Sequence, residues 1–167
     1  MKIDGKDMIM RIRKAEKKDA AGILGLLRQV LELHAALRPD NFIPGTTKYT
    51  EEELLALFEE ENRRTYVAVD ERDEVLGYAL CIVKEQPFSN TMVPFASFFV
   101  DDLCVDAEAR GRHIGEALFA FVKEEAKALG CYEVTLNVWE GNDGAKAFYE
   151  KMGMKPKETQ MELILKS

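Results

Sequence analysis

The stretch of sequence that decides the fold is DLCVDAEARGRHIGEAL, residues 102–118. Apolar residues at its start indicate the end of a buried strand, and regular apolar spacing from Ile114 onward indicates a helix. The turn between them contains Arg110, Gly111, Arg112, His113, Ile114 and Gly115. Such a turn directs backbone N–H groups outward at the positive end of the helix dipole, where a diphosphate is stabilised. Glycine is expected there because a Cβ would block close approach of a ligand to the backbone.

The spacing of this turn excludes two common phosphate-binding fingerprints. It follows neither G-x-x-x-x-G-K-S/T nor G-x-G-x-x-G, so the nucleoside triphosphate and dinucleotide readings both lack their motif. The turn alone leaves one alternative open, which is an ordinary strand-to-helix connection with surface arginines.

The turn resembles the CoA-binding motif R/Q-x-x-G-x-G/A of the GNAT superfamily of N-acetyltransferases, with Arg110, Ile114 and Gly115 in register. His113 stands where the first glycine of that motif usually lies. Downstream, LNVWEGNDGAKAFYEKMGM at residues 136–154 resembles the second motif of the family, a strand followed by N-x-x-A-x-x-F-Y-x-x-x-G-F/M. The matching residues are Asn142, Ala145, Phe148, Tyr149, Gly153 and Met154. Together the two motifs extend the resemblance over residues 95–154.

The resemblance implies how acetyl-CoA, the cosubstrate of the family, would be bound. The turn would hold the diphosphate, and the backbone of Leu103, Cys104 and Val105 would pair with the pantetheine arm. Asn142 would hydrogen-bond the same arm, and Tyr149 would protonate the leaving thiolate. Asn142 is also a good helix cap and Tyr149 a good core residue, so these structural roles stay open.

The remaining sequence pattern predicts an α/β fold. Apolar spacing predicts helices over residues 19–37, from Thr50 onward, over residues 114–129 and over residues 142–152. Alternating or continuous apolar runs predict strands over residues 9–13, 65–69, 75–83, 95–105, 132–138 and 161–165. With the resemblance, these elements imply a single GNAT-like domain over residues 1–167, in which helices flank a mixed, mostly antiparallel central sheet.

Two neighbouring carboxylates are candidates for the removal of a proton from the acceptor. Asp101 and Asp102 precede the expected pantetheine strand, and strand alternation predicts that their side chains point to opposite faces. Most free amines are cations at neutral pH, so a base or a water relay must deprotonate them. The pattern DDLCV also resembles the E-D-x-x-V stretch of polyamine acetyltransferases, which implies a cationic acceptor. For either aspartate, a solvated charge at a strand end or bulge is the alternative.

Three further residues are weighed for the chemistry. A backbone N–H near Leu103 or Cys104 is the expected donor to the thioester carbonyl. A covalent acetyl-cysteine at Cys104 is not expected, because no histidine lies nearby in the sequence to activate the thiol. His34, at the end of the first predicted helix, is expected to be a structural residue.

Composition limits the remaining classes of function. The 167 residues carry a net charge of -7, three widely spaced cysteines and two histidines. This cysteine usage favours a reduced, cytoplasmic protein, and no metal site is expected. The acidic charge argues against nucleic acid as a partner. The charged N-terminus and short apolar runs argue against a secretion signal and a membrane partner. A homodimer stays open.

These observations predict an acetyl-CoA-dependent N-acetyltransferase that works by direct attack of a primary amine in a ternary complex. The expected acceptor is a small amine or a polyamine-like molecule. Acetylation of a protein N-terminus or of a lysine is the enzymatic alternative. A CoA-binding regulatory module without catalysis is the non-enzymatic alternative, and the presence of Tyr149 argues against it.

Overall fold

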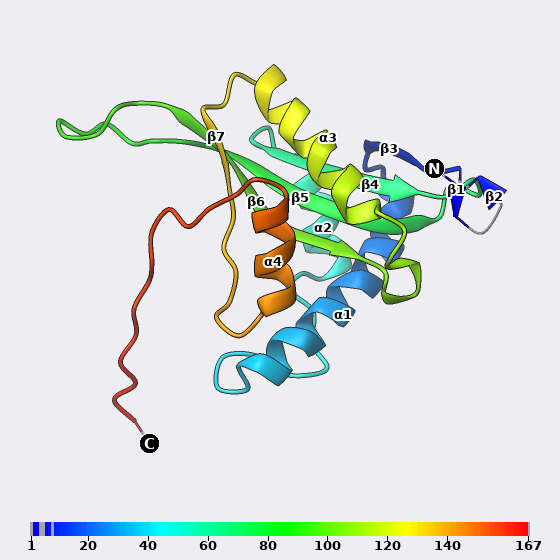
Figure 1. The fold of residues 1–167 in the computed structure, drawn as a ribbon, viewed down its shortest axis with the longest axis horizontal. Coiled ribbons are helices and arrows are strands. Elements are labelled where there is room, and N and C mark those ends of the chain that lie inside the picture. Colours follow the sequence, from blue (N-terminus) through cyan, green and yellow to red (C-terminus); the bar gives the residue numbers. More distant parts are fainter. Residues whose placement is uncertain (1, 4–5, 8, 167) are drawn as a thin grey trace. The chain divides into compact units, whose positions relative to one another are not determined.

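The structure is a computed structural model that describes residues 2–3, 6–7 and 9–166. It contains two compact units, residues 1–137 and residues 138–167 (Figure 1). The elements of the first unit are β1 (Lys2–Ile3), β2 (Lys6–Asp7), β3 (Arg11–Lys14), η1 (Lys17–Asp19), α1 (Ala20–Leu37), α2 (Glu51–Glu59), β4 (Arg63–Val69), β5 (Val75–Glu85), β6 (Ala96–Val105), η2 (Ala107–Ala109), α3 (Ile114–Ala128) and β7 (Glu133–Thr135). The second unit contains α4 (Asp143–Lys151).

A five-stranded sheet forms the centre of the first unit, in the order β3-β4-β5-β6-β7. The first three pairings are antiparallel, and β7 pairs with β6 in parallel. The predicted mixed, mostly antiparallel sheet is therefore confirmed. The five strands each differ from their predicted bounds at one end or both. The largest difference is in β7, which keeps only Glu133–Thr135 of the predicted residues 132–138.

Helices cover both faces of this sheet. Alternate residues of the strands, such as Val67 and Leu80, pack with α1 and α2 in one cluster. Their neighbours, such as Tyr66 and Cys81, pack with Val122 and other residues of α3 in another. Figure 1 shows α3 crossing the front of the sheet. This period-2 alternation of burial is what a strand between two apolar layers requires.

The first helix is the most apolar in the described part of the chain. By length and composition, Lys17–Leu37 could cross a membrane, with a mean hydropathy of 1.3. Its apolar side is occupied, because Ile23 and Leu27 are almost fully buried in the cluster that contains β4 and β5. This burial is typical of the core helix of a globular fold.

Local signals placed several helix ends correctly. The helix predicted from Thr50 onward begins there, because the Thr50 hydroxyl accepts a hydrogen bond from the Glu53 N–H at 3.1 Å. Such a cap contributes about 1 kcal/mol. Gly130 follows α3 with a φ of 75°, a left-handed conformation that favours glycine. Each of these signals acts over only a few residues.

A bulge interrupts the pairing of β6 with β5. Leu80 lies opposite Asp102 and Cys81 lies opposite Val100, so Asp101 is the extra residue on β6. A bulge breaks the strict alternation of side chains along a strand. The prediction that Asp101 and Asp102 point to opposite faces is therefore wrong, as their contacts below show.

The second unit ends in an extended segment. Asn142 caps α4, and Gly153 follows that helix with a φ of 98°. The strand predicted over residues 161–165 is not present, and its side chains are exposed, with Met161 at 84% and Leu165 at 88%. An alternating apolar pattern predicts a strand only if a second strand supplies its hydrogen bonds, and within the described residues this segment pairs with none.

Candidate functional site

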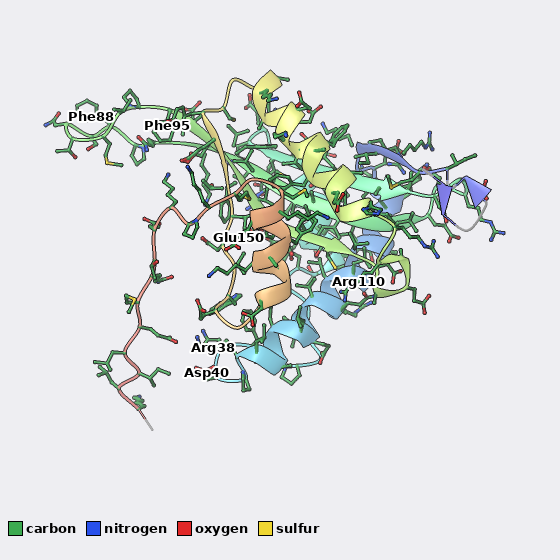
Figure 2. All side chains as sticks on the ribbon, viewed as in Figure 1. Arg38, Asp40, Phe88, Phe95, Arg110 and Glu150 are labelled. Atoms are coloured by element: carbon green, nitrogen blue, oxygen red, sulfur yellow. The ribbon has the colours of Figure 1, made fainter. Side chains whose placement is uncertain are left out.

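The turn predicted to hold a diphosphate has the backbone that such a role needs. After η2 the chain reaches Gly111, with a φ of 78°, and then His113, with a φ of 60°, before α3 begins at Ile114. Figure 2 shows Arg110 in this turn between β6 and α3. The first helical hydrogen bond runs from the Ala117 N–H to the His113 carbonyl at 3.1 Å. The amides at the start of α3 therefore precede the hydrogen-bonded ladder and suit an anion.

His113 occupies the left-handed position that glycine fills in the motif of the resembled family. Histidine tolerates this conformation better than a β-branched residue, which explains how the turn keeps its shape without that glycine. The side chain makes no capping hydrogen bond. Instead, Nδ1 lies 3.2 Å from a carboxylate oxygen of Glu116, and the side chain is 57% exposed. A Cβ added at Gly111 would meet no atom within 4 Å, so the outer side of the turn is open to a ligand.

The second half of β6 has one open edge. Pairing with β7 ends at Phe99 opposite Thr135, whereas β6 continues to Val105. The Asp106 N–H donates to the Leu76 carbonyl at 2.8 Å, so the backbone of residue 106 faces β5. By alternation, the backbone of Cys104 also faces β5, and that of Leu103 and Val105 faces the open edge. No strand within the described residues pairs with this edge beyond Phe99.

The backbone groups of the two predicted carbonyl donors face different sides of β6. The Leu103 N–H points away from β5, on the side where it also lowers the pKa of the Asp102 carboxyl through a hydrogen bond, and the Cys104 N–H points to β5. Leu103 and Val105 are thus the residues with backbone groups available to an extended arm. Of the three residues expected to pair with the pantetheine arm, Cys104 would contribute through its place in the strand rather than through its own backbone groups.

The Cys104 side chain is buried on the face covered by α1. Its thiol lies 3.9 Å from the Leu26 carbonyl, to which it donates a weak hydrogen bond. Burial raises the pKa of this thiol to about 12, and the charge of Asp102 adds to the rise. The thiol is therefore protonated at neutral pH, which supports the prediction that Cys104 is not a nucleophile.

Asp101 is held by two side chains from the segment between α1 and α2. The Tyr49 hydroxyl donates to Asp101 Oδ2 at 2.9 Å, and the Lys48 ammonium lies 3.1 Å from Oδ1. The Lys48 ammonium also lies 3.4 Å from the Asp101 backbone carbonyl. Tyr49 packs against the cluster formed by α1 and α2, so Asp101 points to that face of the sheet.

Asp102 points to the same face. Burial raises the pKa of its carboxyl to about 6, and the nearby charge of Asp101 adds to this rise, while Lys48 and Tyr78 oppose it. The Tyr78 hydroxyl is buried and close enough to affect this pKa, yet it makes no hydrogen bond of normal geometry to the described residues. The bulge thus brings both carboxylates to one side of the sheet. Asp102 has a pKa near neutrality, and Asp101 beside it is paired with the Lys48 ammonium.

Sequence reasoning did not find Lys48 or Tyr49. Both lie between the first two predicted helices, where the sequence pattern predicts no helix or strand, and no periodic pattern marks them. The segment is built by local contacts: the Gly45 N–H donates to Glu32 Oε1 at 2.6 Å, and the rings of His34 and Phe42 lie 5.1 Å apart. Burial, with a contribution from Lys48, lowers the pKa of His34, which agrees with its expected structural role.

Of the two predicted residues of the second unit, Asn142 caps α4 and Tyr149 lies on it. Asn142 Oδ1 accepts a hydrogen bond from the Ala145 N–H at 3.3 Å, so its role as a helix cap is confirmed. The Tyr149 ring is half-buried and meets the Phe148 ring edge-on at 5.0 Å. Their predicted roles toward acetyl-CoA stay predictions.

A hollow of about 360 Å³ lies elsewhere on the first unit, and no predicted site residue lines it. Its walls include Asp19 and Asp73, which both bind Arg13, at 2.7 and 3.1 Å respectively. These ion pairs join β3, the start of α1 and the turn between β4 and β5. The charges of Asp19 and Asp73 are therefore matched within the protein itself.

The chain is similar to one protein family, to a rice enzyme and to a solved bacterial structure. The acetyltransferase (GNAT) family model matches residues 29–154. Glucosamine 6-phosphate N-acetyltransferase 1 of Oryza sativa subsp. japonica is 34% identical over 159 residues, which cover 92% of this chain and 86% of the rice protein. A crystal structure of a mutant of the BH1408 protein from Bacillus halodurans is 32% identical, with a TM-score of 0.89, over 93% of this chain and 99% of that one.

A more distant relative has a different kind of acceptor in its name. The peptidyl-lysine N-acetyltransferase YjaB of Salmonella typhimurium is 26% identical over 148 residues, which cover 89% of this chain and 85% of that protein. None of these relatives is named as a polyamine acetyltransferase, so the resemblance to that branch stays a prediction.

Proposed function

The chain belongs to the acetyltransferase (GNAT) family and is an acetyl-CoA-dependent N-acetyltransferase, and we propose that its acceptor is the primary amine of a small amino-sugar phosphate. The pair of carboxylates at the bulge of β6 carries the proposal of an amine acceptor, and the name of the rice relative supports the sugar phosphate. The pair lies on the strand that leads to the glycine turn, and burial raises the pKa of its Asp102 carboxyl to about 6.

Acetyl-CoA would bind along β6 and its turn. The diphosphate would sit on the amides at the start of α3, next to Arg110 and Gly111. The arm would pair with the backbone of Leu103 and Val105 at the open edge. The Leu103 N–H would polarise the thioester carbonyl and stabilise the oxyanion of the tetrahedral intermediate.

Asp102 would accept the proton of the attacking amine. A base works best when its pKa lies near the operating pH, and a pKa of about 6 meets this condition. Asp101, fixed by Tyr49 and Lys48, would orient the amine. Tyr149 would protonate the departing thiolate, an assignment that rests on its register in the second motif.

Two observations support the class of acceptor. The rice relative is named for glucosamine 6-phosphate, and its match covers most of both chains. A carboxylate pair is also suited to a primary ammonium of any kind, so a polyamine-like acceptor is the next candidate. Acetylation of a protein lysine is supported by the name of the Salmonella relative.

The test is a panel of acceptors assayed with acetyl-CoA by thiol release, with the product identified by mass spectrometry. We expect glucosamine 6-phosphate to give the highest kcat/KM, above unphosphorylated glucosamine, spermidine and a lysine peptide. A higher kcat/KM for spermidine or for the peptide would contradict the assignment of the acceptor. The Asp102→Asn variant serves as the control for uncatalysed transfer.

A further inference from the structure

We propose that Lys48 is itself an acetyl acceptor, whose ε-amine takes the acetyl group from acetyl-CoA bound to the same chain. This proposal rests on the proposed function, because it uses the same carboxylates as the site of the attacking amine. The structure carries it through the position of one side chain. The Lys48 ammonium lies 3.1 Å from Asp101 Oδ1 and 3.4 Å from the Asp101 carbonyl, where the proposed function expects an acceptor amine.

The geometry of β6 brings the acetyl end of the cosubstrate toward this amine. The glycine turn follows the carboxyl end of β6, so an arm held at the open edge must run backward along the strand, from Val105 toward Asp101. These residues are four positions apart on β6, a distance of about 13 Å along a strand. The arm therefore extends from the diphosphate turn toward the bulge, where the Lys48 amine lies.

Lys48 is held by a short anchored segment rather than by a free side chain alone. Its neighbour Tyr49 is bound to Asp101, and the segment before it is tied to α1 through Gly45 and Glu32. Its side chain is 40% exposed, which leaves room for a reagent to reach the nitrogen. An amine that is held near a bound thioester reacts far faster than one that must collide with it from solution.

The step balances with the groups at hand. A carboxylate of the pair, Asp102 by its pKa near neutrality, takes one proton from the Lys48 ammonium. The neutral nitrogen attacks the thioester carbonyl, the C–N bond forms and the C–S bond breaks. The nitrogen gives up a second proton, and the CoA thiolate leaves as the thiol after protonation. The products are an acetyl-lysine, free CoA thiol and one proton, with no oxidant or reductant involved.

This acetylation would change the site that performs it. An acetyl-lysine has no positive charge, so the ion pair with Asp101 would be lost. Asp101 would keep the Tyr49 hydrogen bond, and its negative charge would no longer be paired with an ammonium. The modified chain is therefore expected to bind a cationic acceptor differently from the unmodified chain.

The experiment incubates the purified full chain with isotope-labelled acetyl-CoA and no added amine, followed by peptide mass spectrometry over time. Lys127 is the matched control, because it also forms an ion pair, with Glu124 at 2.9 Å, and lies on α3 far along the sequence. We expect the initial rate at Lys48 to exceed that at Lys127 by about a hundredfold, a modest part of what proximity and a base supply. The rate constant for Lys48 acetylation should not depend on protein concentration. In the Asp102→Asn variant it should fall to the rate at Lys127 or below.

Two results would overturn the inference. Labelling of Lys48 no faster than Lys127 would leave Lys48 as a structural ion pair. A rate constant that rises in proportion to protein concentration would assign the reaction to collisions between chains.

Transfer to glucosamine 6-phosphate is measured in the same preparation to separate the two proposals. If glucosamine 6-phosphate is acetylated but Lys48 is not labelled, only this inference is contradicted. If Lys48 is labelled but no small amine is acetylated, only the proposed acceptor is contradicted. Failure of both reactions contradicts both.

Discussion

The Tyr49 hydroxyl donates a hydrogen bond to Asp101 Oδ2 at 2.9 Å, across 52 positions of the sequence. Burial first, and then the Asp101 carboxylate, raise the pKa of this hydroxyl to about 12, so it stays protonated and keeps its role as a donor at any pH near neutrality. The bond links the segment before α2 to the bulge of β6. It therefore positions the carboxylate that we assign to binding of the acceptor amine.

Replacing this tyrosine tests that role. Tyr49→Phe keeps the ring in its cluster and removes only the bond to Asp101. A hydrogen bond to a charged group is worth about 1.5 kcal/mol or more, so the KM for the amine should rise about tenfold. The Kd for acetyl-CoA, measured by calorimetry, should stay unchanged. Tyr132→Phe is the control, because Tyr132 is 75% exposed. An unchanged KM in Tyr49→Phe would remove Asp101 from acceptor binding.

Asp102 sets the expected response to pH. Its carboxyl has a pKa of about 6 and must be ionised to accept a proton, so kcat/KM should fall as the pH drops through about 6. In Asp102→Asn this acidic limb should disappear and the rate at neutral pH should fall by about 10² or more. A limb caused by the acceptor amine itself would persist in the variant. Profiles of both proteins with the same acceptor separate the two causes.

The turn before α3 offers a test of the histidine that replaces glycine. His113 has a φ of 60°, and the left-handed conformation costs a residue with a Cβ about 1 kcal/mol. His113→Gly should remove this cost, but glycine also gives the unfolded chain more freedom, which offsets part of the gain. The free energy of unfolding should therefore rise by about 0.5 kcal/mol. His113→Ala, which keeps the Cβ, should show no such gain.

The same variants separate two roles of the His113 ring toward acetyl-CoA. If only the backbone amides hold the diphosphate, the Kd of His113→Gly should lie within about twofold of the original value, since glycine leaves the amides in place. A loss of affinity in both His113→Gly and His113→Ala would instead mean that the ring donates to a phosphate.

Features that depend on neighbouring residues could be predicted from the sequence, and features that depend on contacts between distant segments could not. Thr50 caps α2 through a bond to Glu53, and Gly130 ends α3 through its own φ, so both could be predicted from nearby residues. The bulge could not be predicted in this way, because it arises from the register of Asp101 against Leu80 and Cys81 on another strand. The turn was located because its glycine and its apolar flanks lie within one short stretch.

The same reasoning explains the missed residues of the site. Lys48 and Tyr49 reach Asp101 only because the chain returns over the sheet after α1, and one sequence contains no local sign of that approach. The strand predicted over residues 161–165 shows the opposite error. Its alternating pattern is genuine, but a pattern cannot supply the neighbouring strand that would satisfy its backbone.

A buried, protonated thiol leads to a prediction against covalent catalysis. Cys104→Ala should retain turnover within about twofold, because the thiol takes no part in the transfer, and should lower the free energy of unfolding by about 1 kcal/mol through the lost sulfur. Cys131→Ala, at a half-buried position, is the control. Intact mass spectrometry after mixing with acetyl-CoA should detect no adduct on Cys104. An adduct that is absent from Cys104→Ala would reverse this conclusion.

The last prediction concerns Tyr149, the one side chain of the second motif whose hydroxyl can give a proton to a departing thiolate. General acid catalysis contributes about 10² to 10⁴ in rate, so Tyr149→Phe should lower the chemical step within that range. The ring, and with it the contact to Phe148, is kept, so affinity for acetyl-CoA should change little. Steady-state turnover can conceal the effect if product release is slow. The measurement is therefore a single-turnover rate with a verified acceptor, and Tyr132→Phe again controls for the loss of a hydroxyl. An unchanged single-turnover rate would make Tyr149 a structural residue and transfer the role of the acid to water.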